Sequence, residues 1–136
     1  MGMRTRGSRP VVTADRGRCC LMRRGEIHAV DLEPVQGSES NKRRPAVIVS
    51  NDSADRTGVR LGRGVVTVVP VTSSVEQVYP FQVLLAAADT GLSRDSKAHA
   101  EQVRSIDVER IGIRLGVVPA RIMLQIGEAL RLHLAL

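Results

Sequence analysis

The chain has 136 residues, a net charge of +6, and only two aromatic side chains, Tyr79 and Phe81. This length predicts one domain with its own hydrophobic core, and so few aromatic residues argue against a protein that binds single-stranded nucleic acid by stacking bases on an aromatic platform. No apolar stretch is long enough to cross a bilayer, no signal peptide is recognisable, and the adjacent Cys19 and Cys20 lack partners for a disulfide framework. We therefore expect a cytoplasmic protein without membrane contacts.

The positive charge is concentrated at the N-terminus. Seven arginines and one acid, Asp15, precede Gly25, so the remaining 13 basic and 13 acidic residues cancel. Residues 1–21 show no sustained apolar periodicity, and we interpret them as a disordered basic arm or as upstream sequence included by too early a start codon. Residues 22–136 are expected to form the folded domain.

Short β-branched runs between turn-forming residues predict several strands. The first covers 25–32, and after a long loop the second begins at Pro45 and ends at 49. The remaining predictions are strands at 65–71, interrupted by Pro70 near its exit, at 81–85, within 98–106 and at 112–117, with a turn at 89–92 and a helical turn at 107–110 that Asp107 caps.

A C-terminal amphipathic helix is predicted to begin at Pro119. Its apolar stripe consists of Ile122, Ile126, Ala129, Leu130 and Leu134. Short strands followed by one such helix predict a mainly β fold with a C-terminal helix, in the form of a small, partly closed barrel. Met123 and Leu132 lie outside the stripe, and their burial against a second copy predicts a homodimer.

The strongest candidate site combines Arg44, at the start of the second strand, with Thr72, at the end of the third. Pro45 favours an extended conformation for Arg44, and a guanidinium held there can present several donors to a phosphate. If the two strands are antiparallel neighbours, both residues lie on one rim of the sheet. The residues alone are also compatible with a solvated charge run at 42–44 and a simple turn at 72–74.

Other catalytic patterns are weak in this sequence. The three histidines, His28, His99 and His133, are far apart, and each alone is more often structural or on the surface. No pair of carboxylates has metal-site spacing, and there is no Gly-rich phosphate loop or serine elbow. We therefore expect no metal ion and no cofactor.

An ordered set of short motifs resembles the MazF/PemK family of toxin endoribonucleases from type II toxin-antitoxin systems. The motifs are Arg23 to Ile27, Gly37 to Glu39, Arg44 with Pro45, Val71 to Ser73, and Glu101 to Ile106, and the resemblance covers 22–136. It implies an SH3-like barrel and a homodimer that binds RNA along the dimer groove. It also implies metal-independent cleavage, in which attack by the RNA 2′-hydroxyl leaves a 2′,3′-cyclic phosphate and a 5′-hydroxyl.

The resemblance also implies which residues act. The arginine before the proline and the threonine after the third strand are the family's catalytic pair, which carries over to Arg44 and Thr72. We expect the substrate to be bound by Ser38, Glu39, Lys42, Arg43, Ser73, Gln102 and Arg104. His28 departs from the family, whose members often carry Trp or Tyr there.

The resemblance further implies a cognate antitoxin, MazE-like, whose acidic disordered segment would be attracted by the basic groove. Two alternatives stay open at this point. Gyrase-poisoning toxins share the fold and bind DNA gyrase without cleaving RNA, and a fold does not fix an activity. A weaker third possibility is nucleic-acid binding through the arm at 1–21.

Overall fold

The computed structural model describes residues 22–32, 43–51 and 64–136. The predicted N-terminal arm and the loops at 33–42 and 52–63 lie outside these residues. The described elements are β1 (Glu26–Val30), β2 (Arg44–Ile48), β3 (Val65–Thr72), β4 (Gln82–Leu85), α3 (Ala87–Thr90), β5 (Ser96–His99), η3 (Ala100–Gln102), β6 (Arg104–Asp107), η4 (Val108–Arg110), β7 (Ile111–Val117) and α4 (Ala120–Leu134). The predicted order of strands and the C-terminal helix are confirmed.

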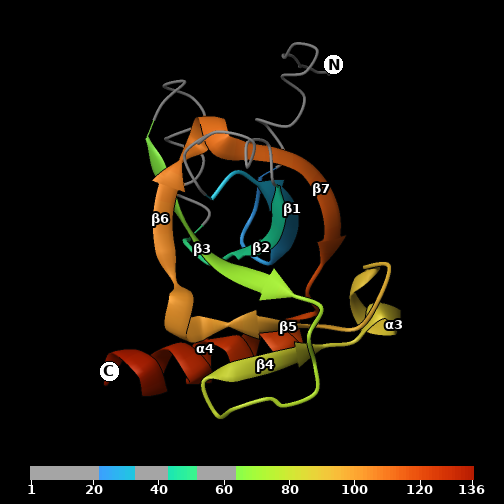
Figure 1. The fold of residues 1–136 in the computed structure, drawn as a ribbon. Coiled ribbons are helices and arrows are strands. Elements are labelled where there is room, and N and C mark those ends of the chain that lie inside the picture. The colour runs from blue at the N-terminus through green and yellow to red at the C-terminus, as the bar shows by residue number, and fades with distance from the viewer. Residues whose placement is uncertain (1–21, 33–42, 52–63) are drawn as a thin grey trace, which may run out of the picture.

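The strands form one antiparallel sheet in the order β4-β5-β3-β2-β1-β7, and β6 pairs with the first half of β3. Figure 1 shows this sheet curling, with β6 and β7 on opposite sides of β1 and β2, while α4 lies along β4 and β5. Among the described residues the edge strands β4 and β7 do not pair with each other. The fold is therefore the expected mainly β, barrel-like sheet with a C-terminal helix, left partly open.

The strands β2 and β3 are buried on both faces, because successive side chains of a strand point to opposite sides of the sheet. The side chains on one face pack with α4 in a first core cluster, which includes Ile126. Those on the other face pack inside the curled sheet in a second cluster, which includes Val68. The first cluster includes Val47, Val69, Val71 and Ile122, and the second includes Ala46, Ile48, Val66 and Ile106. Double-sided burial explains why these strands read as continuous apolar runs.

Pro70 does not interrupt β3, which continues to Thr72 and keeps Pro70 in register with Ala46 of β2. On its other side β3 changes partner at this point, since its pairing with β6 ends at Val68 and its pairing with β5 begins at Val71. A proline is tolerated in a strand where no ladder donor is needed. The break between two partners provides such a position.

Smaller differences concern turns and caps. The predicted turn at 89–92 is the one-turn helix α3, closed by Gly91 with a φ of 87°. Asp107 does precede η4, but its side chain makes no capping hydrogen bond. Pro119 is the N-cap of α4 and not its first helical residue.

His28 has a structural position in β1. Its ring is buried, with Nδ1 2.8 Å from the Gly112 carbonyl oxygen and Nε2 2.9 Å from Glu26 Oε1. Glu26 Oε2 lies 3.3 Å from Arg114 Nη1. These contacts join β1 to β7 and satisfy the polar groups that the curl buries.

The helix α4 packs through Ile122, Ile126 and Ala129, as predicted. Leu134, which was expected on the same face, is 48% exposed in the last turn. Met123 was expected to need a second copy for its burial, but it is partly buried against the core cluster of its own chain. Leu132 is exposed, as expected. None of the helices in the described part of the chain is long and apolar enough to span a membrane.

Replacing Ile126 with alanine should lower the free energy of unfolding by about 3 kcal/mol, because Ile126 is fully buried and its loss leaves a cavity under α4. Gln125 on the same helix is exposed, and Gln125→Ala should change the free energy of unfolding by less than about 0.5 kcal/mol. Urea denaturation of both variants tests this difference. Equal losses would contradict the packing of α4.

Candidate active site

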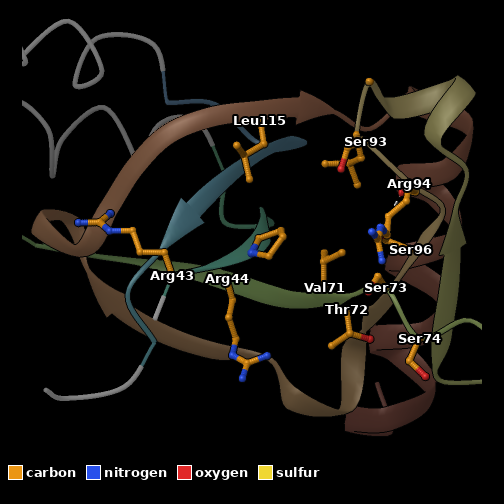
Figure 2. A pocket seen from close by; sticks show the side chains of 13 residues that line it. Arg43, Arg44, Val71, Thr72, Ser73, Ser74, Ser93, Arg94, Ser96 and Leu115 are labelled. Atoms are coloured by element: carbon orange, nitrogen blue, oxygen red, sulfur yellow. Dashed lines mark hydrogen bonds between the residues drawn. The ribbon is translucent and has the colours of Figure 1, made fainter. Parts of the chain in front are cut away.

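Arg44 and Thr72 come from the paired strands β2 and β3. These strands are antiparallel, with Ala46 opposite Pro70, and continuing this register by two residues places Arg44 opposite Thr72. Cross-strand neighbours in this arrangement point to the same side of the sheet. Figure 2 shows both side chains extending to one side, while Val71 points to the other. The predicted antiparallel neighbourhood of these strands is confirmed.

Both residues line an open cleft of about 740 Å³. Its walls come from the start of β2, the end of β3, the segment that precedes β5, and Leu115 of β7. The described lining contains three arginines, four serines and no acidic residue: Arg43, Arg44, Arg94, Ser73, Ser74, Ser93 and Ser96, beside Pro45, Val71, Thr72, Gly91, Leu92 and Leu115. Clustered guanidinium groups with hydroxyl donors provide a site for a phosphate-bearing ligand.

Of the other predicted site residues, the structure places some in the cleft and others outside it. Ser73 lines the cleft beside Thr72. Arg43 also lines it, but its guanidinium extends away from Thr72 (Figure 2) and lies over Gly112, where an added Cβ would be 2.5 Å from Arg43 Nη1. Gln102 on η3 and Arg104 on β6 are exposed and do not line this cleft. Ser38, Glu39 and Lys42 lie outside the described residues.

A hydrogen-bonded network behind Thr72 was not predicted from the sequence. Thr72 Oγ1 lies 2.9 Å from His99 Nε2, and His99 Nδ1 lies 3.1 Å from Glu101 Oε2. Gln82 Nε2 donates to the same carboxylate oxygen at 2.9 Å. His99 is therefore not a surface histidine, since only 12% of its side chain is exposed.

The environment of Glu101 favours its ionised form. Partial burial raises the pKa of Glu101, but hydrogen bonds from His99, Gln82 and its own backbone, together with the charge of His99, outweigh burial and lower that pKa below its ordinary value. Its other oxygen, Oε1, is buried without a hydrogen-bond partner among the described residues. Glu101 therefore remains a carboxylate, and an acceptor, at neutral pH.

The sequence contains one signal for this network, the spacing of His99 and Glu101. Two residues apart, both side chains could face one side of a strand. Strand β5 ends at His99 and η3 carries Glu101, and β5 pairs with the end of β3. That long-range pairing, which no local pattern predicts, brings His99 to Thr72. No group of three or more His, Cys, Asp or Glu residues in the described ranges is placed to hold a metal ion.

Comparison with known proteins places this chain in a family. A family model described as PemK-like, MazF-like toxin of type II toxin-antitoxin system matches residues 23–134. The chain belongs to this family.

Relatives of this MazF-family chain match nearly all of the folded part. Endoribonuclease MazF9 of Mycobacterium tuberculosis is 61% identical over 116 residues, which covers 85% of this chain and 98% of that protein. Endoribonuclease EndoA of Bacillus subtilis is 31% identical over 117 residues, covering 85% and 97%. A mycobacterial endoribonuclease solved in complex with its cognate antitoxin matches with a TM-score of 0.67 at 24% identity, over 85% and 96% of the two chains, which shows a shared fold.

Proposed function

We propose that this MazF-family protein is a metal-independent, sequence-specific endoribonuclease that acts in the cytoplasm as the toxin of a toxin-antitoxin pair. One observation carries the proposal: Arg44 stands opposite Thr72 on an arginine-lined cleft, in a chain that is 61% identical to a named endoribonuclease. We assign the catalytic roles to these two residues.

The reaction uses a nucleophile that RNA itself supplies. The 2′-oxygen attacks the adjacent phosphorus, the bond from phosphorus to the 5′-oxygen breaks, and the proton lost by the 2′-oxygen is matched by one gained by the 5′-oxygen. Negative charge builds on the phosphoryl oxygens in the transition state. The guanidinium of Arg44 stabilises that charge through directed donors, and the Thr72 hydroxyl either orients a phosphate oxygen or relays a proton.

The rest of the RNA extends beyond the cleft, so the proposed binding residues need not all lie inside it. Ser73 and Arg43 line the cleft, and Arg104 sits opposite Val68, further back along β3 from Thr72. We retain all seven predicted contacts as proposals, namely Ser38, Glu39, Lys42, Arg43, Ser73, Gln102 and Arg104.

We further propose that the protein forms a homodimer and is inhibited by a cognate, MazE-like antitoxin with an acidic segment. Two leucines on α4, Leu124 and Leu132, are 73% and 58% exposed, and a second copy would bury them. The arginines of the cleft would attract acidic side chains as well as phosphates. The related mycobacterial endoribonuclease was solved with its own antitoxin, which supports a partner of this kind.

Incubation of the purified protein with a long RNA in excess EDTA tests the proposed function. We expect discrete fragments in EDTA and none from an Arg44→Ala protein prepared in parallel. Cleavage that appears only after a divalent metal is added would refute metal independence. RNA that stays intact under all conditions would favour the gyrase-binding alternative, which the names of the relatives described above do not support.

A further inference from the structure

The Thr72 hydroxyl has a single hydrogen, and its direction decides what Thr72 offers to a ligand in the cleft. If the hydrogen points to His99, the oxygen presents lone pairs to the cleft and acts as an acceptor. If it points into the cleft, Thr72 acts as a donor. Because Thr72 Oγ1 and His99 Nε2 are 2.9 Å apart, the state of Nε2 selects between these two arrangements.

Glu101 determines whether the other nitrogen of the His99 ring, Nδ1, carries a hydrogen. Nδ1 lies 3.1 Å from Glu101 Oε2 and 3.2 Å from Gln82 Nε2. The pKa of Glu101 is lowered, so its carboxylate is ionised and can only accept. Nδ1 must then carry a hydrogen, while Gln82 Nε2 donates to Glu101 at 2.9 Å. Because the Glu101 carboxylate keeps the hydrogen on Nδ1, Nε2 of a neutral ring carries no hydrogen and presents a lone pair.

The two protonation states of His99 therefore give Thr72 opposite polarities. In the neutral ring, Nε2 accepts the Thr72 hydroxyl hydrogen, and Thr72 turns lone pairs towards the cleft. In the imidazolium, Nε2 donates to Thr72 Oγ1, and the hydroxyl hydrogen is released towards the cleft.

We propose that His99 is a positioning residue whose neutral form makes Thr72 a hydrogen-bond acceptor for the attacking 2′-hydroxyl of RNA, so that protonation of His99 slows cleavage. This inference rests on the proposed endoribonuclease function. Within that function, Thr72 acts as an acceptor for the 2′-hydroxyl and not as a donor to the phosphate.

The attacking 2′-hydroxyl needs an acceptor beside the groups that bind the phosphate. Three arginines in the described lining of the cleft supply donors for the phosphate oxygens. A 2′-hydroxyl attacks efficiently only if its hydrogen points away from phosphorus, towards an acceptor. Thr72 extends to the same side as Arg44 (Figure 2), so its oxygen is placed to be that acceptor beside the charge-stabilising group.

Among the residues that the structure describes, one charged group contacts His99 from the elements packed against it. Strand β3 contributes the neutral Thr72 and β4 the neutral Gln82, while η3 contributes Glu101. Arg44 from β2 and Arg94 from the segment before β5 line the cleft together with Thr72, and neither is hydrogen-bonded to His99 in the described part of the chain. Because the pKa of Glu101 is lowered, Glu101 stays ionised over the pH range of the test below.

The pH dependence of His99→Gln tests the proposal, since glutamine can accept from Thr72 through its amide oxygen and donate to Glu101 through its amide nitrogen, but cannot gain a proton. We expect single-turnover cleavage by the unaltered protein, at saturating protein, to fall as the pH is lowered from 8 to 5. His99→Gln should cleave within about fivefold of the unaltered rate at pH 8 and lose this decline. His99→Leu, which leaves Thr72 without its partner, should be slower at every pH.

Two outcomes of the kinetics would overturn the proposal: a decline at low pH that persists in His99→Gln, or a loss at pH 8 as deep as that in His99→Leu. Nitrogen NMR of histidine-labelled protein gives a reading that does not depend on activity, with the His99 signals identified by their absence in His99→Gln. We expect a neutral ring with its hydrogen on Nδ1 at pH 8. A hydrogen on Nε2 would refute the proposal, whereas the expected tautomer in a protein that leaves RNA intact would place the failure in the proposed function.

Discussion

Replacing Arg44 with alanine should lower the single-turnover rate of RNA cleavage by about a thousandfold. Arg44 stands opposite Thr72 in the extended register of β2 and β3 and lines the cleft, and the donors of its guanidinium would meet charge that develops on the phosphoryl oxygens only as the 2′-oxygen attacks. Because that charge is greatest in the transition state, the loss should fall on the rate much more than on RNA affinity. The cleavage rate at saturating protein measures the first effect. Binding to an RNA whose 2′-hydroxyl at the cleaved position is replaced by hydrogen measures the effect on RNA affinity.

Arg44→Lys is the matched variant for this prediction. Lysine keeps the positive charge but loses the planar fork of donors, so we expect a rate between those of the unaltered protein and Arg44→Ala. Arg94→Ala removes a second cleft arginine from outside the proposed catalytic pair and should mainly weaken binding. Equal losses of rate in Arg44→Ala and Arg94→Ala would show that Arg44 contributes only general positive charge.

Replacing Thr72 with valine should lower the cleavage rate by about a hundredfold, because valine has a similar shape but no oxygen to contact the substrate. The substitution also leaves His99 Nε2 without its partner at 2.9 Å. Thr72→Ser restores the hydroxyl and should recover most of the rate. The same single-turnover assay at pH 8 measures all three proteins.

Thermal unfolding of the Thr72 variants controls for damage to the sheet. Thr72 ends β3 and is partly buried, so Thr72→Ser should leave the melting temperature nearly unchanged, whereas Thr72→Val, which removes the partner of His99 Nε2, should lower it by several degrees without unfolding the protein. A folded Thr72→Val protein that cleaves RNA at the unaltered rate would remove Thr72 from the mechanism.

Local sequence patterns were sufficient to predict the elements and the juxtaposition of Arg44 and Thr72. The strands β2 and β3 are consecutive, so their antiparallel pairing was the simplest topology, and Pro45 marked the start of β2. The stripe of α4 was predicted from its helical spacing, which places Ile122, Ile126 and Ala129 on the buried face.

The network behind Thr72 depended on contacts that local patterns do not contain. Strand β3 pairs with β6 before Pro70 and with β5 after it, and the second pairing brings His99 into contact with Thr72. Taken alone, His99 looked like a structural or surface residue in a polar segment, because its burial arises from β3, β4 and η3 together. Met123 was misjudged for a similar reason, since its packing against the core lies beyond the stripe of its own helix.

The chemical ends of the RNA fragments test the central claim most directly. Cleavage by the purified protein in excess EDTA should give upstream fragments that end in a 2′,3′-cyclic phosphate and downstream fragments that begin with a 5′-hydroxyl, because the RNA's own 2′-oxygen is the nucleophile. Mass spectrometry of the fragments from a defined RNA reads both ends at once. Downstream fragments with a 5′-phosphate, paired with upstream fragments ending in a 3′-hydroxyl, would contradict the account, because they require water and not the 2′-oxygen to attack.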